Sequence, residues 1–257
     1  MHDRCVRVLS SGSCGNSILV SADGIDVLID AGISCRELER RMSLMGADPA
    51  RVRAVLLTHE HTDHTRGVRR FCSTHSIPVY STPGTLSLTP HEGVEHRTIE
   101  AGVDFELECL RVRPFRVNHM AADPVAFSMS FDGVKVSIAS DLGCVTPGIV
   151  REMSSASLLM VEANYDDNML MRGRYPDFLK LSIKGDHGHL SNDESGTLSA
   201  EAVGDETRQV VLLHLSMDNN TPTKAESAVR SALRKAGKKV PVSPTDHGGM
   251  NGPIKLP

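Results

Sequence analysis

The sequence predicts an α/β (α+β) fold in which helices cover mixed sheets. Two observations carry this prediction. Short apolar, β-rich runs alternate with helical patterns along the chain, and antiparallel hairpins are expected in both halves. The hairpins exclude an all-parallel barrel, because parallel strands need a long crossover between each pair. With 257 residues and no internal repeat or low-complexity linker, one domain is expected over residues 1–257.

The predicted strands are short apolar segments bounded by turn residues. A small-residue turn at 10–16 separates the first two strands, and Ala22-Asp23-Gly24 closes a hairpin to the third. Asp132-Gly133 closes another hairpin, since this dipeptide tolerates the positive φ of a tight turn. These strands are expected at 6–9, 17–20, 25–29, 110–113, 125–131 and 134–138.

Three helices are expected to begin at capping boxes, in which Ser or Thr accepts a bond from the third amide and Glu reaches back. The boxes are Ser34–Glu37, Ser191–Glu194 and Thr223–Glu226. The last helix is amphipathic, with basic residues on its solvent side. Its apolar face is expected to hold Ala225, Val229, Ala232, Leu233 and Ala236.

Composition restricts the class of protein. The net charge of −4 gives no whole-protein attraction to phosphate, so any nucleic-acid binding requires a local basic patch. An aromatic content of 4% argues against base stacking as the main recognition mode. No segment resembles a membrane span or an export signal. The six widely spaced cysteines contain no CxxC pair, which predicts reduced, mostly buried thiols in a cytoplasmic protein.

The strongest chemical signal is a histidine-rich segment after a predicted buried strand at 54–58. It reads His59-Glu60-His61-Thr62-Asp63-His64. In an extended loop His59 and His61 project to the same side, whereas Asp63 and His64 turn toward a second point. One metal ion cannot comfortably use all four side chains, but two ions roughly 3.5–4 Å apart can. The alternative is a solvated polar loop that is rich in histidine by accident.

Three later residues complete such a site. His119 follows a predicted strand that ends at Val117, and Asp141 and His214 each stand at the end of an apolar strand. Singly, each would more often cap an element or satisfy a local hydrogen bond. Because all three occupy the same topological position as the histidine-rich segment, together they predict a dinuclear metal site.

These residues resemble the metallo-β-lactamase superfamily, whose four-layer αββα sandwich holds two metal ions at the sheet edges. The match to H-x-H-x-D-H and the later His, Asp and His covers nearly the whole chain, and Leu28-Ile29-Asp30-Ala31-Gly32 resembles the first motif of that superfamily. The resemblance implies that Asp30 supports the metal loop without binding metal. It also implies a single domain of this type over residues 1–257.

Further strings resemble the YycJ/WalJ-type subgroup, regarded as DNA exonucleases and related to ribonuclease Z and to a bacterial cyclic phosphodiesterase. One departure concerns Tyr165, where a histidine is expected; a tyrosine is a poor substitute for imidazole at a divalent metal. The strings are Ser11–Ser17, Glu162–Asp166, Gly188–Asn192 and His214–Ser216.

The resemblance assigns a role to each candidate residue. One metal ion would take His59, His61 and His119, and the other would take Asp63, His64 and His214, with Asp141 bridging both. His189 would protonate the leaving oxygen as a general acid, with His187 as its rival, and Asp63 is the second catalytic candidate. Zinc is the first choice for so many histidines, with manganese as an alternative.

The implied reaction is phosphodiester hydrolysis, in which hydroxide made between two metals attacks phosphorus. A DNA exonuclease is favoured; a small-molecule (cyclic) phosphodiesterase or other small-ester hydrolase, and a non-catalytic metal-bound scaffold, are the alternatives. Nucleic acid would contact a basic rim, unless these residues form ordinary solvated faces. No membrane partner is expected, and the oligomeric state is open. The basic rim comprises Arg66, Arg69, Arg70, Arg172, Arg174, Lys180 and Lys184.

Overall fold

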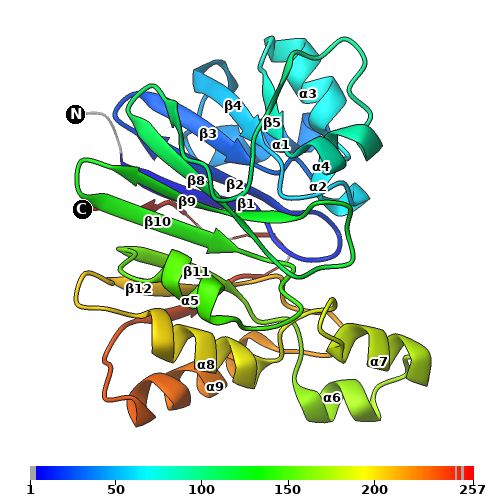
Figure 1. Cartoon of the computed structure of the whole chain (residues 1–257), viewed down its shortest axis with the longest axis vertical. Coiled ribbons are helices and arrows are strands. Elements are labelled where there is room, and N and C mark those ends of the chain that lie inside the picture. Colours follow the sequence, from blue (N-terminus) through cyan, green and yellow to red (C-terminus); the bar gives the residue numbers. More distant parts are fainter. Residues whose placement is uncertain (1–3, 247, 250–251) are drawn as a thin grey trace. The chain divides into compact units, whose positions relative to one another are not determined.

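The computed structural model describes residues 4–246, 248–249 and 252–257 (Figure 1). The chain divides into two compact units. The first comprises Met1–Pro114, Ala121–Val125 and Gly248–Pro257, and the second comprises Phe115–Met120 and Ala126–His247. The sequence predicts that both units belong to one domain, and this stays a prediction.

The first unit is built on a mixed sheet with the strand order β14-β1-β2-β3-β4-β5-β6. Its three N-terminal strands pair antiparallel, as predicted, and β3 to β6 pair in parallel. Parallel pairing places the carboxyl ends of β3 and β4 at the same sheet edge. The strands are β1 (Cys5–Ser10), β2 (Ser17–Ala22), β3 (Ile25–Ile29), β4 (Val52–Leu56), β5 (Val79–Ser81), β6 (His96–Thr98) and β14 (Ile254–Lys255).

Helices of the first unit bury apolar side chains against this sheet. Leu38 and Met42 of α1 and Phe71 of α3 are fully buried in a core that also contains Leu28 and Val55. An antiparallel hairpin joins β7 (Phe105–Leu107) to β8 (Leu110–Arg116), whose alternating burial confirms the strand predicted at 110–113. The helices are α1 (Cys35–Leu44), the 3₁₀ turn η1 (Pro49–Arg51), α2 (Thr62–Thr65), α3 (Val68–His75) and α4 (Pro83–Leu88).

The second unit contains strands in the order β13-β12-β11-β10-β9. The hairpin of β9 and β10 is antiparallel, and β10 to β13 are parallel. Helices α8 and α9 lie beside β11 and β12 (Figure 1), and Leu198 and Val229 pack into the same core as Leu159 and Leu212. The strands are β9 (Val125–Phe131), β10 (Val134–Ala139), β11 (Leu158–Glu162), β12 (Gln209–Leu213) and β13 (Val242–Pro244).

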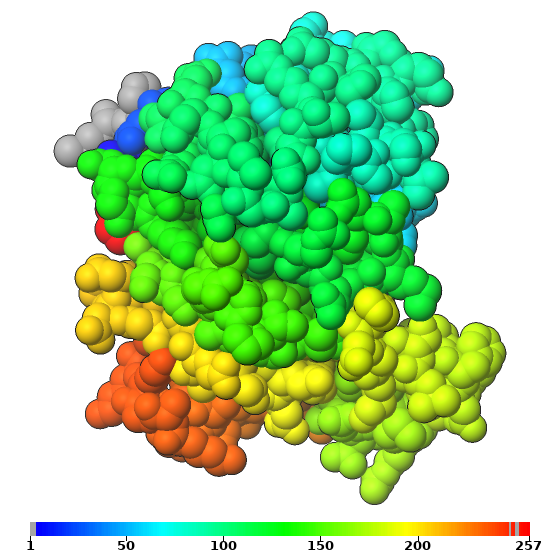
Figure 2. Space-filling view, viewed as in Figure 1, coloured from blue at the N-terminus to red at the C-terminus, as the bar shows by residue number. Residues whose placement is uncertain are grey.

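Two helices project from the body of the second unit. They are α6 (Asp167–Arg172) and α7 (Asp177–Lys184), the yellow-green segment of Figures 1 and 2. The remaining helices are α5 (Pro147–Met153), α8 (Asn192–Ala202) and α9 (Pro222–Lys235). Among the described residues, no helix has the length and apolar character needed to cross a bilayer.

The hairpin turn and one capping box form as predicted. Asp132 and Gly133 both have positive φ, 44° and 77°, and the β9–β10 register continues directly from them. Ser191 and Glu194 form a complete capping box at α8. Ala225, Val229 and Leu233 are buried on α9, as expected, whereas Ala232 is half-buried and Ala236 is exposed at the helix end.

The other two capping predictions need correction. Ser34 caps α1, but the carboxylate of Glu37 accepts bonds from Arg40 and Arg41 instead of reaching back. The cap of α9 is Thr221 and not Thr223. Pro222 explains the shift, because proline is favoured at the first helical position, where its missing N–H costs nothing.

The cysteines are less buried than the sequence suggested. The described residues include all six, and none forms a disulfide. Only Cys5 and Cys72 are buried, while Cys14 and Cys109 are exposed. Burial in the core of the first unit, together with the nearby Cys35, raises the pKa of the Cys72 thiol to about 12.

Thiol reactivity should follow this division. A maleimide added to the native protein is expected to modify Cys14 and Cys109 quickly, because both are accessible. Cys72 should react only after unfolding, because its thiol is buried and its raised pKa keeps the thiolate fraction low. Peptide mass spectrometry after short labelling measures each site. Rapid modification of Cys72 in folded protein would show that α3 does not pack as described.

Candidate metal centre

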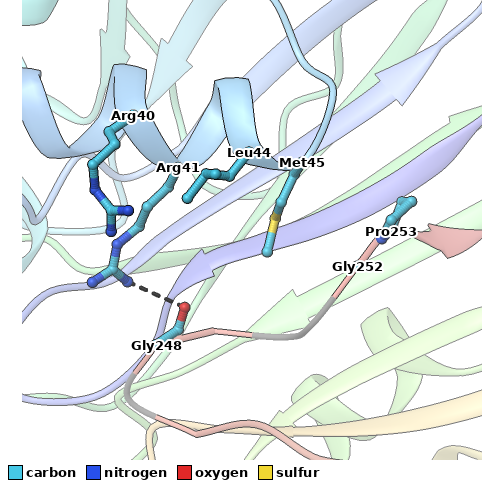
Figure 3. A pocket seen from close by; sticks show the side chains of 7 residues that line it. All are labelled: Arg40, Arg41, Leu44, Met45, Gly248, Gly252 and Pro253. Carbon is cyan, nitrogen blue, oxygen red and sulfur yellow. Dashed lines mark hydrogen bonds between the residues drawn. The ribbon is translucent and has the colours of Figure 1, made fainter.

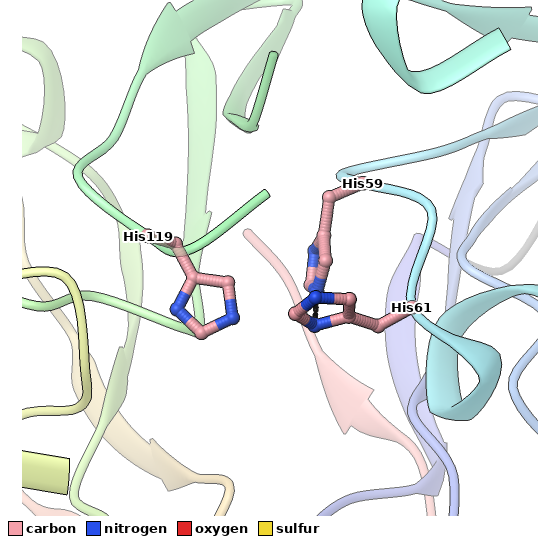
Figure 4. Close-up of side chains that lie close together, drawn as sticks. All are labelled: His59, His61 and His119. Atoms are coloured by element: carbon pink, nitrogen blue, oxygen red, sulfur yellow. Dashed lines mark hydrogen bonds between the residues drawn. The ribbon is translucent and has the colours of Figure 1, made fainter. Parts of the chain in front are cut away.

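The first cluster of candidate ligands follows β4, on the loop that leads into α2. His61 is the residue preceding α2, and Figure 4 shows His59 and His61 on this loop, joined by the dashed contact. His59 Nε2 lies 3.0 Å from His61 Nδ1. Two nitrogen ligands of a tetrahedral zinc ion, each about 2.0–2.1 Å from the metal, lie roughly 3.3 Å apart. The pair therefore fits a shared metal ion, as the spacing predicted.

His64 is oriented by a buried carboxylate. Its Nδ1 donates to Asp30 Oδ2 at 2.7 Å, and the amide and hydroxyl of Thr58 donate to the same carboxylate at 2.9 and 2.8 Å. This bond places the proton on Nδ1 and leaves the lone pair on Nε2, the atom that would bind metal. The structure thus gives Asp30 the supporting contact that the motif suggested.

Asn16 reaches the other side of the same cluster. Its amide nitrogen lies 3.0 Å from His64 Nε2 and donates to Asp63 Oδ2 at 3.2 Å. Asp63 is partly exposed, with its side chain 23% accessible, whereas His64 is fully buried. Asp63 Oδ2 lies 3.5 Å from His64 Nε2, so these two predicted ligands converge.

Backbone contacts hold the metal loop against the preceding motif. The amide of Asn16 donates to the Asp63 carbonyl at 2.7 Å, and the amide of Ala31 donates to the His64 carbonyl at 2.8 Å. A Cβ at Gly32 would lie 1.6 Å from the Asp63 carbonyl oxygen. Only glycine allows this approach, which gives a physical reason for the small residues in both strings.

The second cluster lies at the carboxyl ends of β10, β11 and β12 in the second unit. Asp141, Glu162, His189 and His214 each offer a ligand atom, and these atoms all lie within 4.8 Å of one another. His119, which Figure 4 shows on the segment after β8, places Nε2 3.8 Å from Asp141 Oδ1. The parallel strands β10, β11 and β12 bring Asp141, Glu162 and His214 together, and the segments after β8 and before α8 add His119 and His189. The structure therefore brings together His119, Asp141 and His214, which the sequence singled out.

Glu162 is the functional candidate that sequence reasoning did not single out. It is fully buried and accepts bonds from His189 Nδ1 at 2.7 Å, His214 Nδ1 at 2.9 Å and the Leu142 amide at 2.7 Å. Burial opposes its ionisation, but the charge of His189 and the bonds from both histidines outweigh this and lower the pKa of Glu162. Glu162 is the single carboxylate at the end of an apolar strand, just as Asp141 follows one. That pattern in the sequence could have identified it as a candidate.

Hydrogen bonds also fix the orientation of His119. Its Nδ1 donates to the Gly188 carbonyl at 3.1 Å, so Nε2 carries the lone pair that faces Asp141. Burial, opposed by the charge of Asp141, lowers the pKa of His119. A neutral imidazole is the form that binds a metal ion.

The pKa of His189 is shifted in the opposite direction from that of His119. Burial alone would lower the pKa of His189, but the charge and hydrogen bond of Glu162, helped by Asp141, raise it above the ordinary value. Its rival His187 has an exposed side chain, and its backbone carbonyl accepts a bond from the Met120 amide at 3.1 Å. The structure therefore brings His189, and not the His187 side chain, into the second cluster.

Tyr165 is a packing residue in this structure. It is 2% exposed and pairs with Ser191 in an isolated β-bridge. Burial, with the nearby charge of Glu194, raises the pKa of its hydroxyl, so the phenol stays neutral. A neutral phenol is a weak metal ligand.

The basic rim is only partly available to a ligand. Lys180 is buried and donates to the Met171 carbonyl at 3.1 Å, because α7 folds back on α6, and Lys184 is paired with Asp167. Lys180 is therefore corrected from a phosphate contact to a tether between α6 and α7, whereas Lys184 is exposed and its contact with phosphate stays a prediction. The other rim residues, Arg66, Arg69, Arg70, Arg172 and Arg174, are exposed.

Comparison with known proteins identifies the family. The model of the beta-lactamase superfamily domain matches residues 26–215. The chain belongs to this superfamily. It is 31% identical, over 90% of this chain and 89% of the relative, to "Exodeoxyribonuclease YycJ" of Bacillus anthracis.

Solved structures confirm the fold along almost the whole chain. The metallo-β-lactamase fold protein YhfI from Bacillus subtilis gives a TM-score of 0.72 at 16% identity and covers 96% of this chain and 98% of its own. Zn²⁺-bound PqqB from Methylobacterium extorquens gives 0.73 at 19% identity and covers 98% and 100%. The predicted α/β metallo-β-lactamase class is thus confirmed. This superfamily member is a hydrolase, and its ligand clusters imply a divalent metal ion.

Replacing Glu162 with Gln tests its supporting role. Oε1 accepts from both imidazoles and Oε2 accepts from the amides of Leu142 and Leu190, so a glutamine must turn its NH2 group toward one pair of N–H donors. We therefore expect metal affinity to fall about 10–100-fold. Competition with a chromophoric chelator measures the affinity. Glu201→Gln, an exposed change on α8, is the matched control and should leave the affinity unchanged. Unaltered metal affinity in folded Glu162→Gln protein would contradict this role.

Proposed function

We propose that the protein is a metal-dependent phosphodiesterase that degrades DNA as an exonuclease. The observation that carries the proposal is the buried Glu162 carboxylate, which accepts bonds from both His214 and His189. One carboxylate thereby orients a candidate metal ligand and a candidate proton donor together. The resemblance to an exodeoxyribonuclease at 31% identity supports nucleic acid as the substrate.

The candidate ligands of the two clusters are proposed to be shared between two ions. We propose that His59, His61 and His119 hold one ion and that Asp63, His64 and His214 hold the other, with Asp141 between them. The hydrogen bonds that protonate Nδ1 of His64, His119 and His214 favour Nε2 as the ligand atom of each. Zinc suits this donor set, and manganese is the alternative. When bound, such ions lower the pKa of water to ~7 and neutralise charge on phosphoryl oxygens.

His189 is the proposed general acid. Its Nδ1 donates to Glu162, which leaves Nε2–H of the imidazolium to protonate the departing oxygen. The side chain is 22% accessible, so it can reach a substrate. An alkoxide leaving group needs this proton far more than a thiolate does, which favours phosphodiesters over thioesters. Asp63, also partly exposed, can position the attacking water through its carboxylate.

A small, cyclic phosphodiester or another small ester is the second candidate substrate. The observation that favours it is the loss of rim cations, since Lys180 is buried and bonded to the Met171 carbonyl and Lys184 is paired with Asp167 at the surface. Fewer available cations beside the second cluster leave less attraction for a long polyanion.

Substrate class can be tested directly. Purified protein with Mn²⁺ or Zn²⁺ is incubated with single-stranded and duplex DNA labelled at the 5′ or 3′ end, with RNA, and with cyclic nucleotides. The proposal predicts stepwise shortening of DNA that stops when EDTA removes the metal. Cleavage of cyclic nucleotides alone would favour the second candidate. Metal-independent activity would contradict both candidates.

Histidine substitutions separate proton transfer from metal binding. His189→Ala is expected to keep the metal content of the unaltered protein but lose ~10²-fold or more in turnover, because the leaving oxygen departs without its proton. His214→Ala should lose metal, and His187→Ala, two residues from His189, should change neither property. Elemental analysis and initial rates measure these effects. Metal loss in His189→Ala would mean that its role and that of His214 are exchanged.

A further inference from the structure

A surface hollow of about 450 Å³ lies within the first unit, next to the segment that carries the first cluster of candidate ligands. Three arginines line it, Arg36 on α1 together with Arg66 and Arg70. Arg66 comes two residues after His64, and the next residue, Gly67, donates its amide to the Ala31 carbonyl at 2.7 Å. The hollow and the histidine cluster are therefore held by the same backbone segment.

The charge of this hollow is strongly positive. Within the described part of the chain, none of its three guanidinium groups forms an ion pair with a carboxylate, and all three are exposed. Arg66 Nη1 donates to the Cys14 carbonyl at 3.2 Å, which leaves its charge uncompensated. The one carboxylate in the lining, Glu39, is engaged by His75 Nε2 at 2.8 Å.

A second hollow, at the other end of α1, shows the contrast (Figure 3). It is also about 450 Å³ and contains Arg40 and Arg41, but both guanidinium groups donate to Glu37. Those bonds lower the pKa of Glu37 to about 2. Arg41 donates further to the Gly248 carbonyl, the dashed line in Figure 3. Its cations are already partnered, so this hollow offers little to an anion.

A third basic hollow, of about 370 Å³, lies at the end of α9. This end of α9 is at the sheet edge opposite the second cluster of candidate ligands. Val242 of β13 is in parallel register with Val210 near the start of β12, whereas His214 follows the end of β12. The intervening helix of 14 residues spans about 21 Å. A phosphate there would be far from the second cluster.

We infer that Arg36, Arg66 and Arg70 form a subsite for a backbone phosphate of the nucleic-acid substrate, one that does not contact the reacting phosphate. This inference rests on the proposed function and identifies where the strand is held. The parallel strands β3 and β4 lead to the start of α1 and to the histidine cluster at one sheet edge, so a strand entering the site passes the arginines. Exposed guanidinium groups bind phosphate through paired N–H donors.

The test uses Arg36→Gln/Arg70→Gln, because neither residue adjoins a proposed metal ligand. Arg40→Gln is the matched control, an exposed arginine of the same helix as Arg36 that donates to Glu37 and lies outside the hollow. Binding of a fluorescent single strand with hydrolysis-resistant phosphorothioate links is followed by anisotropy across a salt series. Loss of two phosphate contacts should weaken binding roughly tenfold and reduce the log–log salt slope by about 1.4. The control should match the unaltered protein.

Hydrolysis of bis(p-nitrophenyl) phosphate separates this subsite from the catalytic centre, since that diester has no second phosphate. The double variant should hydrolyse it at the unaltered rate. Unchanged affinity and salt slope in the double variant, or equal losses in Arg40→Gln, would overturn the subsite. Weakened binding in the double variant, with no DNA cleavage by the unaltered protein, would support the subsite and overturn the exonuclease proposal.

Discussion

A buried carboxylate bonded to an imidazole is the interaction on which each cluster of candidate ligands depends. Asp30 performs this role for His64 in the first unit, and Glu162 performs it for His214 in the second. In both cases the carboxylate follows or ends a buried strand and fixes the proton on Nδ1. Since the remaining nitrogen is then a lone-pair donor, the protein determines in advance which atom of each histidine can bind a metal ion.

Strained backbone accompanies these contacts. Asp30, Asp141 and His214 all have positive φ, at 57°, 58° and 55°. Each such residue costs of order 1–3 kcal/mol unless its surroundings compensate. The compensation here is local, because Asp30 gains the bonds from Thr58 and His214 gains the bond from Glu162. The strain turns these side chains out of the strand direction at the point where ligands must converge.

Burying several acids and imidazoles together carries a desolvation cost that apolar residues would avoid. Glu162 illustrates the balance, since burial raises its pKa while the two histidines lower it. Divalent cations would offset this cost further by adding positive charge among the carboxylates. The arrangement is therefore better explained as a metal site than as a device for stability.

The fold class could be predicted, and the candidate ligands could be located, because their signals are local. The periodicity of apolar residues predicted the positions of the strands, and the H-x-H-x-D-H spacing predicted the position of the first cluster. Glu162 escaped because its importance arises only when β11 and β12 bring it beside His214, a contact 52 residues apart in the chain. Lys180 was misplaced for the same kind of reason, since only the packing of α7 on α6 shows that its amine is internal. The cap of α9 was missed because Pro222 competes with the Thr223 pattern.

The central claim is that the histidines and acids at these strand ends together hold a pair of metal ions. Elemental analysis of protein purified without chelator or added metal tests it most directly. The account predicts about two divalent ions per chain. Folded protein that binds no divalent ion, or retains only one when both are supplied in excess, would contradict it.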